Sequence, residues 1–94
     1  MRVVWRAAAR TDVLRLIGHI AAENPIAARR VARALMLAGD SLVEFPHRGR
    51  TGNDPRTREL VALWPYIIVY ETLTDVHILR VWHGAQLRQD GSTG

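Results

Sequence analysis

The chain carries few side chains that could do covalent chemistry. No Cys occurs among its 94 residues, which removes thiol nucleophiles, disulfides and cysteine-based zinc sites. Ser41 and Ser92 both lack the glycine-flanked motif of a serine nucleophile. Catalysis through a covalent intermediate is therefore not expected.

Metal and nucleotide sites lack a sequence signature as well. His77 and His83 lie six residues apart on one expected strand, which separates them by about 20 Å, too far to share an ion. The other two histidines belong to no motif. Gly49 and Gly52 match neither of the glycine-rich nucleotide fingerprints. We expect no metal and no cofactor.

The residue types that remain are those of metal-free acid–base work on RNA. Such chemistry needs an acid or base beside cations that hold the scissile phosphate. The same residues also fit a purely structural role, with the loop arginines in solvent and the histidine as the polar end of a strand. The candidates are Arg50, Arg58, Tyr66, Arg80 and His83.

The charge balance indicates an anionic partner. Thirteen basic residues against nine acidic ones give a net charge of +4, and every basic residue is Arg. Arg grips carboxylate or phosphate in a bidentate fashion, so the surface favours an acidic protein segment or a nucleic acid. A codon bias toward Arg would also explain the missing Lys, but the positive charge attracts anions whatever its origin.

Length and composition predict one small globular domain. At 94 residues, with 48% hydrophobic and 23% charged residues, the chain has material for a single core. We expect the domain to cover residues 1–86 and residues 87–94, which end in Gly-Ser-Thr-Gly, to form a flexible tail. No stretch is typical of a membrane span or a signal peptide, so we expect a cytoplasmic protein with no membrane partner.

The first half of the sequence predicts a strand and two helices. Residues 2–5 suit a short opening strand, and residues 8–22 show apolar side chains at helical spacing. Asn24-Pro25 ends the first helix and begins a second one, over residues 25–43. The apolar stripe of this second helix, which ties it to the core, consists of Val31, Leu35, Ala38 and Leu42.

The second half predicts a loop and three strands. Pro, Gly and Asn-Asp punctuate residues 45–58, which we expect to be a loop. Strands are expected over residues 59–63, 66–70 and 76–82. The order βααβββ predicts an α+β fold, in which a hairpin of two helices covers one face of an antiparallel sheet.

The last two strands define the other face of the sheet. A turn at Leu73-Thr74 would place Ile67 opposite Arg80 and Val69 opposite Ile78, with Trp82 on that same face. Because a charged side chain is costly to bury unpaired, we expect this face to be turned outward as a shallow surface. Apolar side chains outside the stripe of the second helix can also mark a contact surface, and they are Met36 and Leu37.

Four segments, in order, resemble the RelE/ParE family of bacterial type II toxins. The resemblance covers residues 2–86, including the Asn24-Pro25 junction. It implies a βααβββ toxin of a plasmid-stabilisation module, acting in the cytoplasm and neutralised by a cognate antitoxin. The segments that carry it are LVEFPHRGR (residues 42–50), REL (58–60), PYIIVYE (65–71) and ILRVWHGA (78–85).

The family divides by activity. RelE-like members cleave mRNA on the ribosome without a metal, whereas ParE-like members inhibit DNA gyrase. The nuclease branch commonly carries Arg after the first Tyr of the Tyr-x-x-x-Tyr strand, and this chain has Ile67 there. The resemblance thus favours a gyrase inhibitor. An mRNA endonuclease, with Arg58, Tyr66, Arg80 and His83 as its catalytic candidates, and a decayed homologue that only binds its antitoxin are the alternatives.

For the favoured function we expect a set of contact residues that meet the target or the antitoxin. The antitoxin segment that binds them is expected to be acidic, because the toxin is basic. The expected contact residues are Leu37, Arg50, Arg58, Arg80, Trp82 and His83.

Overall fold

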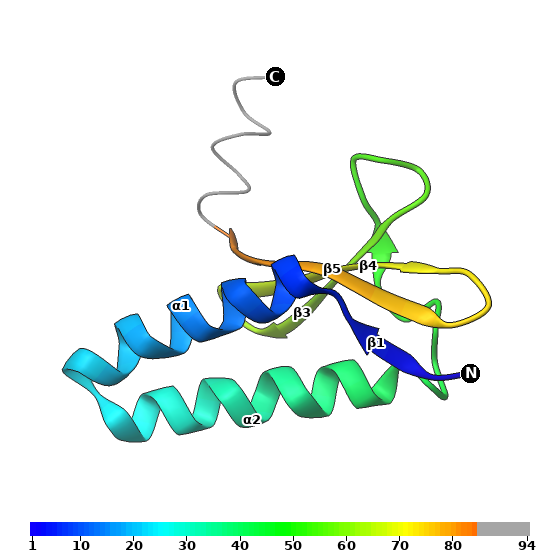
Figure 1. The fold of residues 1–94 in the computed structure, drawn as a ribbon. Coiled ribbons are helices and arrows are strands. Elements are labelled where there is room, and N and C mark those ends of the chain that lie inside the picture. The colour runs from blue at the N-terminus through cyan, green and yellow to red at the C-terminus, as the bar shows by residue number, and fades with distance from the viewer. Residues whose placement is uncertain (85–94) are drawn as a thin grey trace.

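The structure, a computed structural model, describes residues 1–84 and has two layers. A pair of helices lies along one face of a five-stranded sheet (Figure 1). This architecture confirms the expected α+β fold; residues 85–94, with the domain end at 86 and the tail at 87–94, lie outside the described part. The elements are β1 (Val3–Trp5), α1 (Ala7–Glu23), α2 (Pro25–Ser41), β2 (Arg50–Thr51), β3 (Arg58–Leu63), β4 (Tyr66–Thr72) and β5 (Val76–His83).

A single residue connects the two helices, as the Asn24-Pro25 pair predicted. The Asn24 backbone N–H donates to Ile20 O at 2.8 Å and thereby caps α1. The Asn24 side-chain oxygen accepts from Ala27 N–H at 3.0 Å and begins α2, with Pro25 in its first turn. Neither helix of residues 1–84 is long and apolar enough to cross a membrane.

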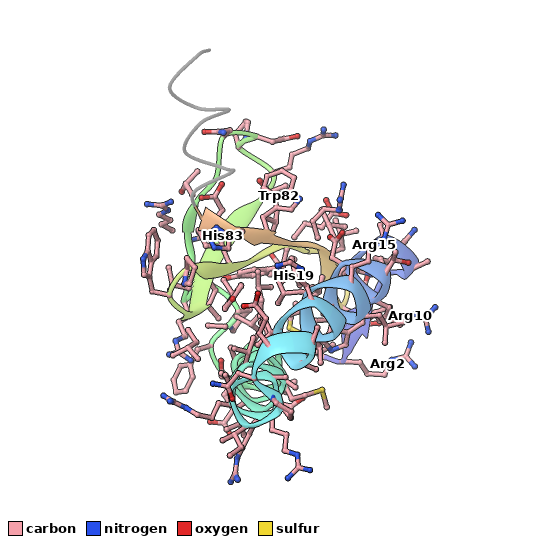
Figure 2. All side chains as sticks on the ribbon, turned by 90° about the vertical axis from the view of Figure 1, so that its left-hand side faces the viewer. Arg2, Arg10, Arg15, His19, Trp82 and His83 are labelled. Atoms are coloured by element: carbon pink, nitrogen blue, oxygen red, sulfur yellow. The ribbon has the colours of Figure 1, made fainter. Side chains whose placement is uncertain are left out.

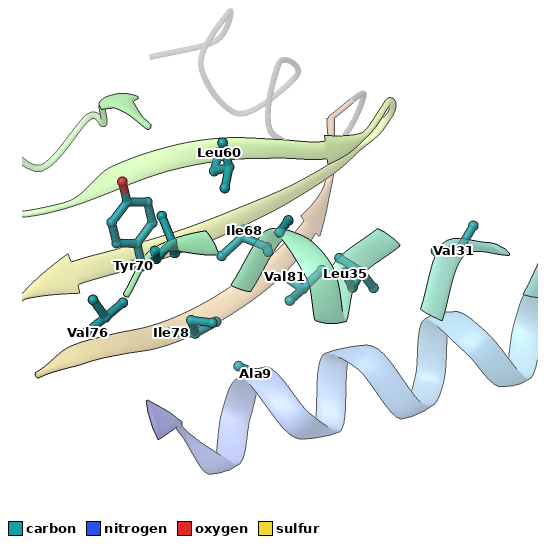
Figure 3. Close-up of a cluster of buried hydrophobic side chains, with 11 residues drawn as sticks. Ala9, Val31, Leu35, Leu60, Ile68, Tyr70, Val76, Ile78 and Val81 are labelled. Carbon is teal, nitrogen blue, oxygen red and sulfur yellow. The ribbon is translucent and has the colours of Figure 1, made fainter. Parts of the chain in front are cut away.

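The core lies between α2 and the inner face of the sheet, which is the face toward the helices. The predicted stripe of α2, from Val31 to Leu42, is buried as expected. It meets Leu60 of β3, Ile68 and Tyr70 of β4, and Ile78 of β5 (Figure 3). Fully burying a side chain of this size contributes about 1.5–3 kcal/mol, so these contacts hold the two layers together.

The sheet places β5, the last strand of residues 1–84, in its interior. The strand order is β1-β5-β4-β3-β2, so β5 lies between β1 and β4. All neighbours are antiparallel except β1, which runs parallel to β5 through the pairs Val3–Val76 to Trp5–Ile78. The two-residue strand β2 extends the sheet within the segment expected to be only a loop.

The expected register of the β4–β5 hairpin is wrong by two residues. Ile67 pairs with Trp82 instead of Arg80, and Val69 pairs with Arg80 instead of Ile78. The turn is longer than expected, because Thr72 pairs with Val76. The register then shifts by one more residue at Leu79, which lies between Ile78, the partner of Tyr70, and Arg80, the partner of Val69. A shift of one residue moves the β5 side chains to the opposite face of the sheet relative to β4. Two such shifts together return the residues beyond Leu79 to the face that was expected for them.

Candidate functional site

The face of the sheet away from the helices gathers charged and apolar side chains in two cross-strand rows, here called the outer face. Directly paired residues on neighbouring strands project to the same side. The first row therefore runs across four strands and the second across three. They are Arg50–Glu59–Val69–Arg80 and Val61–Ile67–Trp82.

Arg80 lies at the β5 end of the first row and is held by a carboxylate from α1. Its Nε–H donates to Asp12 Oδ2 at 2.7 Å, and its Nη2–H donates to Asp12 Oδ1 at 3.0 Å. The guanidinium carbon lies 5.8 Å from the ring centre of Trp82, within cation–π range. The Arg80 side chain nevertheless remains 46% exposed, so this clamped cation is presented to solvent.

Asp12 also protects the edge of β5. Because β1 pairs only as far as Ile78, no strand within residues 1–84 lies beside the edge of β5 beyond that residue. The backbone N–H of Val81 lies on this stretch and donates to Asp12 Oδ2 at 3.0 Å. Burial by itself would raise the pKa of Asp12, but the hydrogen bonds from Arg80 and Val81 outweigh it and hold that pKa below its ordinary value.

A second clamped arginine lies at the other end of the same row. Arg50 donates from Nη2 at 3.1 Å and from Nε at 3.3 Å, both to Glu59 Oε1. Glu59 is buried, whereas the Arg50 side chain is 69% exposed. The row thus ends in an exposed guanidinium on each side, with the buried Val69 between them.

The structure does not bring the nuclease candidates together. Arg58 pairs with Tyr70 and therefore lies on the inner face, where its Nη1 donates to Gly49 O at 2.8 Å. Tyr66 and His83 pair with each other on that same face, and their rings meet edge to face with centres 5.6 Å apart. Of these four, only Arg80 projects from the outer face, which it shares with Arg50, the remaining residue expected for work on RNA.

The expected contact residues divide in the same way. Arg50, Arg80 and Trp82 share the outer face, whereas Arg58 and His83 do not. Leu37 is 59% exposed on α2, in the other layer. Figure 2 shows Trp82 above the sheet, with Arg2, which precedes β1, and Arg10 and Arg15 of α1 along one side of the molecule.

Two further features of the described residues bear on chemistry. Within residues 1–84 no group of three or more His, Asp or Glu side chains is arranged to hold a metal ion. An open hollow lies beyond the end of α2, apart from the outer face, and its lining includes Phe45 and Arg48. There the Arg48 Nη1–H donates to Ser41 Oγ at 2.8 Å.

Sequence reasoning missed both carboxylates that hold the arginines of the outer face. Asp12 lies 68 residues before Arg80 and has no local motif. Its position on a polar face of α1 is typical of a solvated side chain. The pairing of Glu59 was predictable in part, because a carboxylate in an apolar strand needs a cationic partner if it is buried.

Comparison with known proteins identifies the family. The model of the ParE toxin of the type II toxin-antitoxin system parDE matches residues 3–88. Toxin RelE2 of Caulobacter vibrioides is 41% identical over 92% of this chain and 98% of its own length. Toxin RelE1 of the same bacterium is 40% identical over 85% of this chain and 89% of its own.

The fold has a solved counterpart as well. A chain from the chromosomal ParDE toxin-antitoxin system of P. aeruginosa superposes with a TM-score of 0.78. The two chains share 22% identity, and the match covers 88% of this chain and 95% of the other. Sequence and fold therefore agree that this chain belongs to the RelE/ParE family of type II toxin-antitoxin toxins.

Proposed function

We propose that this chain is a toxin that inhibits DNA gyrase by protein contacts through its outer face, in the cytoplasm, and that a cognate antitoxin neutralises it. The observation that carries the proposal is the separation of Arg80 from Arg58, Tyr66 and His83, which lie on the opposite face of the sheet. A nuclease needs its acid, base and phosphate-holding cations around one phosphate. These side chains do not provide such a site.

The composition of the outer face supports a protein target over RNA. Its centre, Ile67 and Val69, is buried, so the side chains left for a partner to contact include the exposed Arg50 and Arg80 and the half-buried Trp82. Trp and Arg are the side chains most often found at the energetic centre of protein interfaces. The Arg80 guanidinium carbon lies over the Trp82 ring, 5.8 Å from its centre, so a base stacking on that ring face would have to displace the arginine.

Ribosome-dependent mRNA cleavage is the second candidate function. It is favoured by the names of two relatives, Toxin RelE2 and Toxin RelE1. In this case Arg80 would hold the phosphate, while the paired Tyr66 and His83 would have to act from the end of the sheet.

Induced expression in a bacterial host distinguishes the functions. Gyrase inhibition predicts a DNA-damage response and filamentation while transcripts stay intact. Cuts at a fixed codon position in translated messages would overturn the proposal in favour of the nuclease. Growth without either response would identify a homologue that has lost toxicity and only binds its antitoxin.

The proposed antitoxin is recognised by charge. A toxin with a net charge of +4 and exposed arginines favours an acidic partner segment. The name of the P. aeruginosa relative, a ParDE system, supports a partner encoded beside the toxin. Reading the neighbouring open reading frame tests this, because a short gene with an acidic segment is expected there.

A further inference from the structure

We infer that Asp12 is a positioning residue, which fixes Arg80 so that the outer end of its guanidinium receives a carboxylate of the target protein. The inference rests on the proposed function, because it names the chemistry by which the outer face holds its target. It adds a residue of α1, in the other layer of the fold, to the binding site. Three observations carry it.

The first observation is which hydrogens of Arg80 are already used. Asp12 takes Nε–H and one Nη2–H, which form one side of the planar guanidinium. The Nη1 hydrogens and the second Nη2 hydrogen have no protein acceptor within residues 1–84. They form the terminal edge of the group, a second fork that matches a carboxylate in a bidentate geometry.

The second observation is that the side chain cannot turn freely. Asp12 is itself fixed, because its Oδ2 also accepts from Val81 N–H and its side chain is only 13% exposed. Trp82 lies beside the guanidinium plane. A long side chain that is ordered in advance loses less conformational entropy when a partner binds, so the clamp increases affinity without touching the partner.

The third observation is that the same arrangement recurs across the sheet. Glu59 binds Arg50 through Nε and Nη2 and leaves Nη1 without a protein acceptor in the described part of the chain. The backbones of Arg50 and Arg80 are three strand spacings apart in one row, about 14 Å. At each end of the row a carboxylate therefore binds Nε and Nη2 of an exposed guanidinium.

A protein carboxylate fits this site better than a nucleic-acid phosphate. Between the two arginines the first row holds Glu59, which is paired with Arg50, and the buried Val69, while the second row adds the buried Ile67 and the exposed Val61. A charged backbone with a phosphate on every nucleotide would desolvate there without compensation. A protein partner can place a single acidic side chain against each guanidinium and apolar side chains elsewhere, so that it desolvates no unpaired charge.

A double-mutant cycle on growth arrest tests the inference. The four toxins are the parent, Asp12→Asn, Arg80→Ala and the double variant, expressed at matched abundance. Asp12→Asn keeps one oxygen for Val81 N–H but loses the charge and the fork. Asp40→Asn, an exposed carboxylate on α2, is the matched control and should leave growth arrest unchanged.

Because Asp12 acts through Arg80, each single variant should weaken growth arrest by about tenfold or more, the typical cost of a lost hydrogen bond to a charged group. The double variant should be no weaker than Arg80→Ala alone. Additive losses would overturn the inference, since they would mean that Asp12 only stabilises the fold. Full toxicity of Asp12→Asn beside a weakened Arg80→Ala would overturn it too, while leaving the proposed function standing.

Two further results separate the inference from the identity of the target. Arg80→Lys keeps the charge but loses the fork, so its toxicity should fall nearly as far as that of Arg80→Ala. Full toxicity of Arg80→Lys would overturn the bidentate contact. Growth arrest is read without reference to gyrase, so a non-additive cycle combined with transcript cleavage would refute the proposed function and the carboxylate contact, and would keep only the role of Asp12 in positioning Arg80.

Discussion

At the scale of single residues, the outer face depends on pairs of charges that come from distant parts of the chain. Arg80 is exposed enough to reach a partner, yet Asp12 and Trp82 hold it in place. An unheld arginine on the same surface would sample many rotamers and would bind more weakly. The effect of a substitution therefore depends on what holds the side chain as much as on its charge.

Replacing Arg80 with Ala should reduce toxicity by about tenfold or more, the effect of losing one residue at the energetic centre of an interface. The free energy of unfolding should fall by no more than about 1 kcal/mol, because the ion pair is partly exposed and Val81 N–H still bonds Asp12. Growth arrest and chemical unfolding measure the two effects. Arg10→Ala, an exposed arginine of α1, is the control, and equal losses from both variants would contradict the prediction.

Tyr70 should contribute to stability through its hydroxyl group. The Oη atom accepts from Gly49 N–H at 2.8 Å and donates to Pro46 O at 2.9 Å, which fixes the segment before β2 against the core. Tyr70→Phe leaves that buried N–H without an acceptor, which should cost about 1–3 kcal/mol in chemical denaturation. Tyr66→Phe should cost less, because the Tyr66 hydroxyl bonds no protein atom within residues 1–84.

At the scale of elements, the sequence predicts the pieces of the fold better than the way they pair. The helical spacing of Val31, Leu35 and Leu42 fixes which side of α2 is buried, and Asn24-Pro25 marks the helix junction, because both signals are local. The hairpin register was wrong because the length of a turn and the extra residue at Leu79 depend on packing across the sheet.

The candidate site could likewise be predicted only in part. The sequence correctly assigned Arg80 and Trp82 to one outward face, because two register errors cancelled beyond Leu79. It could not assign the faces of Arg58, Tyr66 and His83 in the same way. Their positions follow from the β3–β4 pairing and from the end of β5, for which the chain carries no local signal.

Two helix glycines should respond in opposite ways to Ala. A Cβ at Gly39 of α2 would lie 2.7 Å from Trp5 Cζ2 and 3.2 Å from Ile78 Cδ1, so the β1–α2 contact must shift. We expect Gly39→Ala to cost about 1–3 kcal/mol by overpacking. At Gly18 a Cβ would meet no atom of another element within 4 Å in the described part of the chain, so Gly18→Ala should stabilise α1 by up to about 1 kcal/mol. Thermal unfolding of both variants checks the difference, and two shifts of the same sign would contradict it.

The contact between α1 and β5 should weaken in acid. The pKa of Asp12 is lower in the folded protein than its ordinary 3.8. Its contribution to stability is therefore complete above about pH 4 and is lost as the pH falls through the folded pKa. Denaturation of the parent and of Asp12→Asn from pH 6 downward measures this. The stability gap between them should narrow below pH 4, and a gap that stays constant would contradict the prediction.

At the scale of the whole molecule, charge and layering divide the surface. The net charge is +4, and all 13 basic residues are arginines, with exposed examples on the sheet and on α2. The outer face and the outward sides of the helices lie in different layers (Figure 1). A partner on one layer therefore need not exclude a partner on the other.

The toxin and its antitoxin should separate as salt rises. If the partner segment is acidic, screening weakens the attraction, since the Debye length falls from about 10 Å at 0.1 M salt to about 3 Å at 1 M. Calorimetric titration of the purified antitoxin at several NaCl concentrations measures the dependence. An affinity that does not change with salt would contradict an electrostatic interface.

The place of β5 inside the sheet has a consequence for the timing of harm to the host cell. β1 and α1 are synthesised first, yet both depend on β5, which is made after the other four described strands and lies between β1 and β4. A nascent chain that ends before Val76 has no partner for β1 and nothing to receive Asp12. The chain can therefore complete its outer face only after residues 76–83 have been translated and have left the ribosome, and a premature stop codon upstream of them should yield a product that cannot form that face.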